Sequence, residues 1–256
     1  MRAIILAGGK GTRLLPYTTV LPKPLMPVGD MPILEVVLRQ LKAAGFDHAT
    51  MAVGHLAELL RAFFNDGARF GLSIDYSMEH KPLGTVGPLT LIPNLSSTFL
   101  MMNGDVLTTL NYADLIAHHR RSGAIATIAT YLRQAKVDFG VIKADPSNRL
   151  TEYVEKPTHN YRVSMGVYVF EPEVLRYLNP GEYRDFPDLI RTLIAEGKDV
   201  VSYPFSGYWL DIGRPDDYAR ATEEFESRRA EFLPARTRAE LHPVETGAEL
   251  LPAETS

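Results

Sequence analysis

The chain has 256 residues, 45% of them hydrophobic and 23% charged, so it can bury a sizeable core as one large domain or two lobes. Its net charge of −4 and the lack of a long basic run argue against nucleic-acid binding, and the absence of cysteine excludes disulfides and thiolate metal sites. The first apolar run is too short for a signal peptide, and no stretch approaches the roughly 18 apolar residues of a membrane-spanning helix. We therefore expect a cytoplasmic protein without a membrane partner.

The first predicted element is a strand over residues 1–7, which leads into the glycine cluster Gly8-Gly9-Lys10-Gly11-Thr12-Arg13. Glycine allows the backbone to turn with positive φ and to present bare N–H groups to an anion. Arg13 follows the glycines at once, and Lys23 lies in a proline-flanked loop, so two cations can converge on a phosphate. The start of the chain therefore predicts a phosphate-binding loop.

Two common glycine motifs do not fit this loop. A P-loop requires a Gly-Lys-Ser/Thr ending, whereas Gly11 is followed by Thr12-Arg13, so a GTP-dependent switch is not predicted. A dinucleotide fingerprint requires a third glycine where this chain has Leu14. The simplest alternative is a strand-turn segment whose glycines only turn the chain.

Strand and helix patterns alternate through the first half of the chain. Helices are predicted from 30–32 to Gly45, over 56–64 and from Asn111 to Arg121, and strands over 48–53, 72–76, 98–102 and 124–131. This alternation predicts right-handed crossovers and a mostly parallel sheet covered by helices, which binds ligands at the carboxyl ends of its strands.

Two loops of this half carry candidate site residues. The loop 78–87 contains Glu79 and precedes a short helix at 88–91, and the strand 98–102 runs into Asn103-Gly104-Asp105. A carboxylate at the end of a buried strand is costly unless it is paired, hydrogen-bonded or metal-bound. Asp105 is therefore either a ligand of a magnesium-bound triphosphate or a turn residue.

The second half is richer in strands. These are predicted over 139–142, 150–155, 163–170 and 200–203, with helices over 172–178, 186–194 and from Pro215 to about Phe232. At one strand's end, Glu155 can accept bonds from hydroxyl groups and Lys156 can hold a phosphate, unless Glu155-Lys156-Pro157 is only a solvated turn. Asp211 follows the chain's single tryptophan, Trp209, and is either a metal ligand or a residue hydrogen-bonded near a helix start.

We expect the elements over residues 1–232 to form one domain. Residues 233–256 show no periodicity and contain three prolines, so a disordered tail is predicted.

Taken in order, five segments resemble the sugar-phosphate nucleotidyltransferase family, whose members make NDP-sugars. They are the glycine loop with Arg13, Pro22-Lys23-Pro24-Leu25, Asn103-Gly104-Asp105, Glu155-Lys156-Pro157 and Trp209-Leu210-Asp211. The resemblance covers about residues 1 to 225. It implies a Rossmann-like α/β fold of the nucleotide-diphospho-sugar transferase type with a smaller β-rich sugar-binding part. Residues 1–232 would then be one catalytic domain, with 1–135 mainly binding nucleotide and 136–232 mainly binding sugar phosphate. It also implies Mg²⁺ and the transfer of a nucleotidyl group from a nucleoside triphosphate to a sugar 1-phosphate. Relatives are commonly dimers or tetramers, but no residue pattern fixes a homo-oligomer here.

The resemblance also implies roles for individual residues. The catalytic residues that the resemblance implies are Arg13, Lys23, Asp105, Lys156 and Asp211, of which Asp105 and Asp211 bind the metal. The nucleotide-binding set is Leu6, Ala7, Gly8, Gly9, Gly11, Thr12, Arg13, Lys23, Glu79, Pro82, Leu83, Gly84, Thr85, Asn103 and Gly104. The sugar-phosphate-binding set is Gly140, Glu155, Lys156, Ser164 and Gly166.

The sequence does not decide which base the nucleotide carries or which sugar 1-phosphate accepts it. Glu79 favours guanylyltransferases acting on mannose or heptose 1-phosphates, because a carboxylate can accept both the N1–H and the N2–H of guanine. Ser164-Met165-Gly166 departs from the Asn-x-Gly of many members, which leaves the sugar undetermined. The alternatives are a thymidylyl-, uridylyl- or cytidylyltransferase for another sugar, and a catalytically silent regulator that binds an NDP-sugar. Retention of both aspartates and all three cations argues against the silent regulator.

Overall fold

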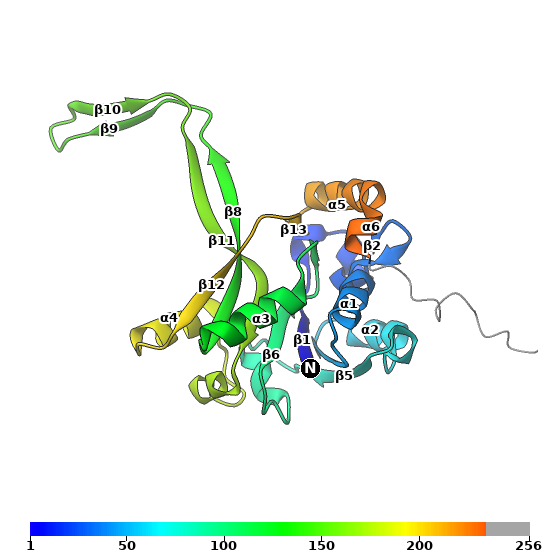
Figure 1. The fold of residues 1–256 in the computed structure, drawn as a ribbon. Coiled ribbons are helices and arrows are strands. Elements are labelled where there is room, and N and C mark those ends of the chain that lie inside the picture. The colour runs from blue at the N-terminus through cyan, green and yellow to red at the C-terminus, as the bar shows by residue number, and fades with distance from the viewer. Residues whose placement is uncertain (234–256) are drawn as a thin grey trace, which may run out of the picture.

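A computed structural model describes residues 1–233, so the predicted tail lies outside the described part except for Leu233. Its centre is a seven-stranded sheet in the order β12-β8-β11-β6-β1-β4-β5 (Figure 1). In chain order these strands are β1 (Arg2–Ala7), β4 (His48–Val53), β5 (Ser73–Met78), β6 (Phe99–Asn103), β8 (Ala126–Lys136), β11 (Thr158–Phe170) and β12 (Val200–Phe205).

The sheet confirms the predicted mostly parallel α/β fold. Neighbouring strands pair in parallel everywhere except on the two sides of β11, which runs antiparallel to both β6 and β8. The carboxyl ends of β1, β4, β5 and β6 therefore lie at one edge of the sheet, as the predicted crossovers require. Strand β8 ends at this same edge.

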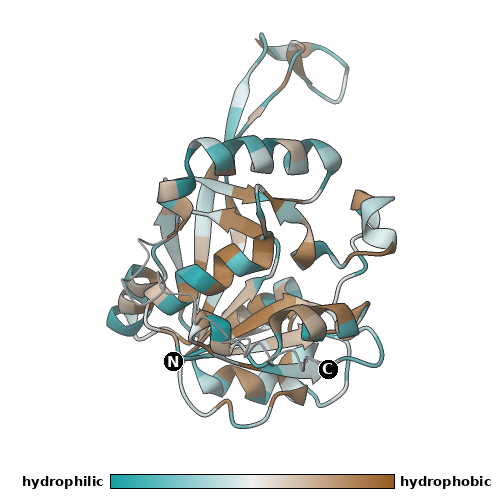
Figure 2. Cartoon of the chain, turned by 90° about the vertical axis from the view of Figure 1, so that its right-hand side faces the viewer, coloured by the Kyte–Doolittle hydropathy of each residue, from teal (hydrophilic) through white to brown (hydrophobic). Residues whose placement is uncertain are grey.

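Helices cover both faces of the sheet, and their positions match the sequence prediction closely. The first face carries α1 (Ile33–Ala43), α2 (Ala57–Phe64) and α3 (Tyr112–Ser122), and the second carries α4 (Phe186–Ala195). On β1, Ala3 and Ile5 pack on the first face and Ile4 on the second, all fully buried, as expected for a central parallel strand. Figure 2 shows brown, hydrophobic segments in the interior of the body.

The short predicted helices are 3-10 turns in the structure, namely η5 (Gly87–Leu91) and η6 (Pro172–Tyr177), while η4 (Ala68–Phe70) was not predicted. Three more 3-10 turns, η1 (Thr12–Leu14), η2 (Tyr17–Thr19) and η3 (Lys23–Leu25), shape the segment after β1. Within the described residues, no helix is both long enough and apolar enough to cross a membrane.

A third hydrophobic cluster joins distant parts of the chain beside the glycine loop. It packs α5 (Pro215–Ser227) and α6 (Arg229–Phe232) against α1 and against two small sheets. These sheets pair β2 (Pro27–Val28) with β3 (Met31–Pro32), and β7 (Val106–Thr108) with β13 (Trp209–Asp211). Leu14 and Ile212 are fully buried in this cluster, so it anchors the residues next to Arg13 and Asp211.

The predicted β-rich part takes an extended form. Strands β8 and β11 continue beyond the sheet as a two-stranded ribbon, and β9 (Val141–Ala144) and β10 (Leu150–Val154) form a hairpin at its far end. We call residues 132–163 the arm. It projects from the sheet edge where β8 ends and stands clear of the body (Figure 1). Strand β8 is consequently longer than the predicted strand 124–131.

Candidate nucleotide-binding site

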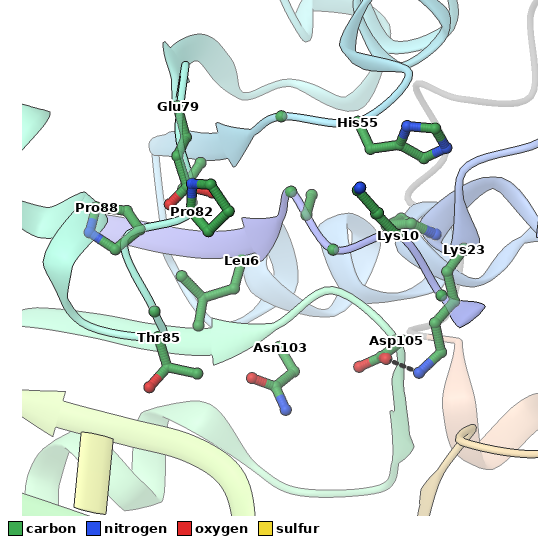
Figure 3. Close-up of a pocket in the computed structure, with 18 of the residues that line it drawn as sticks. Leu6, Lys10, Lys23, His55, Glu79, Pro82, Thr85, Pro88, Asn103 and Asp105 are labelled. Carbon is green, nitrogen blue, oxygen red and sulfur yellow. Dashed lines mark ion pairs between the residues drawn. The ribbon is translucent and has the colours of Figure 1, made fainter. Parts of the chain in front are cut away.

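A cavity of about 920 Å³ lies at the carboxyl ends of β1, β4, β5 and β6, where the parallel sheet predicts a ligand (Figure 3). Its volume is in the range of small-molecule sites. Most of the predicted nucleotide-binding set lines it, namely Leu6, Ala7, Gly8, Gly9, Gly11, Thr12, Arg13, Lys23, Glu79, Pro82, Gly84, Thr85 and Asn103, together with Asp105.

The glycine loop is held by contacts at Gly8 and Gly11 and is uncovered at Gly9. Gly11 has φ +62°, and its carbonyl accepts a 2.8 Å bond from the Thr18 hydroxyl, which holds the turn against η2. A Cβ on Gly8 would lie 3.2 Å from the Gly54 backbone nitrogen, whereas a Cβ on Gly9 would meet nothing within 4 Å. The Gly9 backbone is therefore the part of the loop that a ligand can approach most closely.

Two cations of the predicted set border the cavity in different states. Lys23 forms an ion pair with Asp105, and the two side chains are only 12% and 17% exposed. The dashed line in Figure 3 marks this pair. Arg13 is exposed, and among the described residues its side chain has no hydrogen-bonding or ionic partner, although a Cβ on Gly213 would lie 3.3 Å from its guanidinium. Arg13 is thus available to an anion beside the Trp209–Gly213 segment.

Asp211 is brought next to Asp105 by the pairing of β7 with β13. Asp211 opposes Val106, the residue after Asp105, and the Ile212 N–H donates to the Asp105 carbonyl at 3.4 Å. Burial raises the pKa of Asp211, the charge of Asp105 raises it further, and Lys23 and Arg13 lower it. Two partly buried carboxylates therefore repel each other at this point.

This aspartate pair fits a hard divalent cation. One oxygen of Asp105 is held by Lys23, and the other, Oδ1, is buried without a partner among residues 1–233. Mg²⁺ typically takes one or two carboxylates and completes its shell with substrate phosphates and water. In the described part of the chain no group of three or more metal-ligating side chains occurs, so phosphate oxygens would have to supply the remaining ligands.

Glu79 lies on the opposite wall, at the end of β5. Its Oε2 accepts a 3.0 Å bond from the Leu83 N–H. Burial raises the pKa of Glu79, and the Leu83 N–H partly offsets that rise. No hydrogen bond to Glu79 Oε1 occurs among residues 1–233, and the Glu79 side chain lies next to Pro82 at the cavity (Figure 3).

Several predicted residues lie outside the lining set. The Leu83 side chain is buried in the body, and Gly104 is held by its N–H bond to the Leu6 carbonyl at 3.0 Å. A Cβ on Gly166 would lie 2.7 Å from Asn103 Nδ2, so Gly166 lies directly against the Asn103 side chain. The Ser164 hydroxyl bonds the Tyr168 hydroxyl at 3.0 Å.

Gly140, Glu155 and Lys156 are on the arm and do not line this cavity. Glu155 and Lys156 are 59% and 58% exposed. Gly140 lies under Tyr153, because a Cβ there would be 2.3 Å from the tyrosine hydroxyl, and that hydroxyl donates to Glu155 Oε2 at 2.8 Å. The structure keeps the three residues near one another and separates them from the glycine loop.

The cavity also contains polar residues that the sequence analysis did not single out: Lys10, His55, His80, Lys81 and Tyr183. His55 follows strand β4, so the rule that ligands bind at carboxyl ends of parallel strands could have found it. Lys10 and the loop residues His80 and Lys81 are inside segments already chosen. Tyr183 reaches the cavity from the loop before α4, and no sequence signal points to it.

The fold and the cavity together define an α/β protein with a small-molecule cavity at a glycine loop. Residues 2–228 match the sequence pattern of the nucleotidyl transferase family, and the chain belongs to this family.

Two relatives illustrate its range. The chain is 36% identical over 248 residues to a UTP–glucose-1-phosphate uridylyltransferase of Synechocystis, with 89% of this chain and 64% of that protein covered. It is 34% identical over 231 residues to a mannose-1-phosphate guanyltransferase of Schizosaccharomyces pombe, with 87% and 63% covered. The chain thus spans somewhat under two thirds of the length of these relatives.

Solved structures agree with the fold. A Bacillus anthracis protein described as a candidate glucose-1-phosphate thymidylyltransferase, in complex with sucrose, superimposes with a TM-score of 0.71 at 25% identity, covering 87% of this chain and 94% of that one. HddC from Yersinia pseudotuberculosis superimposes with a TM-score of 0.68 at 24% identity, covering 88% and 99%, which supports the fold alone.

Proposed function

We propose that the chain is a sugar-1-phosphate nucleotidyltransferase. The observation that carries this proposal is the Lys23–Asp105 pair, which lies on the cavity of the glycine loop with Asp211 beside it, in a chain of the nucleotidyl transferase family. A glycine loop, cations and a carboxylate pair are what a reaction between two polyanions requires.

In the proposed reaction an oxygen of the sugar 1-phosphate attacks the α-phosphorus of the nucleoside triphosphate. The bond from the α-phosphorus to the bridging oxygen breaks, and pyrophosphate leaves with that electron pair. The attacking oxygen is already anionic, so no protein nucleophile is needed, and positioning and charge neutralisation supply the catalysis.

Each residue has a part in this scheme. The N–H groups of the glycine loop and Arg13 hold the β- and γ-phosphates, and Lys23 neutralises the α-phosphate where charge builds up. Asp105 and Asp211 would hold Mg²⁺, which supplies further charge neutralisation at the leaving pyrophosphate. Lys156 binds the phosphate of the sugar, and Glu155 accepts bonds from its hydroxyls.

For the base we propose guanine. The half-buried carboxylate of Glu79 lines the cavity and accepts one hydrogen bond, from the Leu83 N–H to Oε2, and burial raises its pKa. The N1–H and N2–H of guanine are two adjacent donors, whereas uracil and thymine offer one. The relatives named above include both a uridylyl- and a guanyltransferase and so support either base, and mannose or heptose 1-phosphate is proposed with GTP.

The test is pyrophosphate release in the presence of Mg²⁺, with GTP, dTTP, UTP, CTP and ATP crossed against mannose, glucose and heptose 1-phosphates. We expect release with GTP and one of these sugars, and a preference for GTP that weakens in Glu79→Gln. Arg13→Ala should lower the rate about 10²–10³-fold, or about 2–4 kcal/mol, whereas Arg191→Ala on the exposed face of α4 should not. No release with any pair, while an NDP-sugar still raises the melting temperature, would instead favour the silent regulator.

A further inference from the structure

His55 lies against the glycine loop and has no part in the reaction scheme above. It follows β4, and its N–H donates to the Gly8 carbonyl at 3.3 Å, while a Cβ on Gly8 would lie 3.2 Å from the Gly54 nitrogen. The next residue, Leu56, has φ +54°, a conformation that costs a non-glycine residue energy and that clusters near functional sites. The backbone of His55 is therefore fixed beside the loop, and the chain turns sharply after it to begin α2.

The imidazole of His55 is partly buried, lines the cavity and is unpaired. Within the described residues 1–233, neither of its ring nitrogens has a hydrogen-bond or ionic partner. Other histidines of the sheet are paired, since His48 contacts Asp75 at 3.2 Å and His119 contacts Glu171 at 3.1 Å. An imidazole with two unpaired nitrogens at a polar cavity is suited to binding a ligand.

The charges that face His55 are mostly positive. The charged residues that line the cavity are the cations Lys10, Arg13, Lys23 and Lys81 and the carboxylates Glu79 and Asp105. Figure 3 shows Lys10 and Lys23 at the same end of the cavity as His55, and Glu79 at the other end. Asp105 is engaged by Lys23, and Glu58, in the first turn of α2, is exposed. The end of the cavity that holds His55 is thus built for an anion.

A triphosphate at this end would change the protonation of a nearby histidine. Its phosphates bring several negative charges, and an opposite charge at short range favours the protonated imidazole. An imidazolium donates two N–H bonds, whereas a neutral imidazole donates one, so protonation also strengthens the contact with phosphate oxygens. Binding of the phosphates and uptake of a proton are therefore coupled wherever a free histidine lies beside them.

We infer that His55 is a further phosphate-binding residue, which takes up a proton when a triphosphate binds and donates to the phosphates that leave as pyrophosphate. This inference rests on the proposed function, because that function places the β- and γ-phosphates on the glycine loop. His55 is joined to the loop at Gly8, and the uncovered backbone of Gly9 follows at once. Affinity for a triphosphate and for pyrophosphate, but not for a monophosphate, then rises as the pH falls.

The test is titration calorimetry of the wild type and of His55→Gln, with Mg²⁺ and without a sugar 1-phosphate. The ligands are GTP, UTP, their monophosphates and pyrophosphate, and two buffers of different ionisation enthalpy report the proton uptake. A histidine whose pKa rises from about 6.5 to about 7.5 on binding takes up about half a proton at pH 7. The same rise tightens binding about sevenfold between pH 8.5 and pH 6.

We expect the wild type to take up about half a proton more than His55→Gln when a triphosphate or pyrophosphate binds, and the ratio of their dissociation constants to grow about sevenfold from pH 8.5 to pH 6. The monophosphates should bind both proteins equally at both pH values. His55→Lys, which stays charged, should bind the triphosphate without the extra proton. The matched control is His118→Gln on α3, outside the cavity, which should behave as the wild type.

An equal pH dependence of the wild type and His55→Gln overturns the inference, and so does loss of the extra proton in His80→Gln instead, since His80 also lines the cavity. Monophosphate binding that weakens as much as triphosphate binding overturns it too, because His55 would then only shape the cavity. A wild type that binds neither a triphosphate nor pyrophosphate has the same consequence. The proposed function fails separately, when the triphosphate binds with the expected proton uptake but no sugar 1-phosphate releases pyrophosphate.

Discussion

The Lys23–Asp105 pair should contribute measurably to folding stability, because both partners are largely withdrawn from water at 12% and 17% exposure. At a contact separation of about 3 Å and an effective dielectric constant of about 20, the attraction between two unit charges is about 5 kcal/mol before desolvation is subtracted. Removing one partner of a fully buried pair costs about 3–5 kcal/mol. Because this pair borders an open cavity, we expect Lys23→Met to cost about 2–3 kcal/mol.

A double-mutant cycle isolates the interaction. Lys23→Met, Asp105→Asn and the double variant are unfolded in urea without nucleotide or metal, with Trp209 fluorescence as the probe, since it is the chain's only tryptophan. We expect a coupling energy of about 1–2 kcal/mol. The surface pair Lys198–Glu173, with partners 37% and 43% exposed, is the control and should show far less coupling. If the losses in unfolding free energy of Lys23→Met and Asp105→Asn sum to the loss of the double variant within about 0.5 kcal/mol, the two side chains do not stabilise each other.

Three further predictions concern Asp211, Gly84 and Gly9. The fold raises the pKa of Asp211 above its ordinary 3.8. Ionising this carboxyl group therefore destabilises the fold, and the loss develops as the pH rises from about 3.8 through the raised pKa. Asp211→Asn should therefore raise the urea concentration at the unfolding midpoint at pH 7, and this gain should disappear below about pH 4. A gain that persists in acid would show that the charge of Asp211 is not its cause. Gly84→Ala should cost at least about 2 kcal/mol of stability, since Gly84 has φ +77° and its Cβ would lie 2.5 Å from the Arg184 carbonyl oxygen. Gly9→Ala should leave urea unfolding unchanged and weaken triphosphate binding measured by calorimetry, and unchanged binding would mean that no ligand approaches this backbone.

The sequence predicted the local elements well because their signals are local. The helix from Asn111 is one example: the Asn111 side chain accepts bonds from the Ala113 and Asp114 N–H groups, as a capping residue should. The strand over 48–53 is another, and its bounds agree with β4. Glycine, proline and the spacing of apolar residues fix such features within a few positions of the chain.

The meeting of the glycine loop, Arg13, Lys23 and Asp105 at one cavity was predictable for a related reason. Glycines, Arg13, Lys23 and Asp105 all lie in segments that follow parallel strands, and the carboxyl ends of those strands meet at one edge of the sheet. Knowing the strand order was not necessary to expect them together. Tyr183, in contrast, reaches the cavity through a long-range approach of the loop before α4, which no local pattern encodes.

The sequence by itself determined the alternating α/β elements, the glycine loop and the chemical types of the site residues. Only the tertiary structure decided which of these residues meet. It joined Asp211 to Asp105 through the β7–β13 pair, and it carried Glu155 and Lys156 away from the glycine loop on the arm. The physical reason is that helix and strand formation depends on neighbours in sequence, whereas the direction in which a long ribbon extends depends on packing across the whole sheet and on whatever surface covers it.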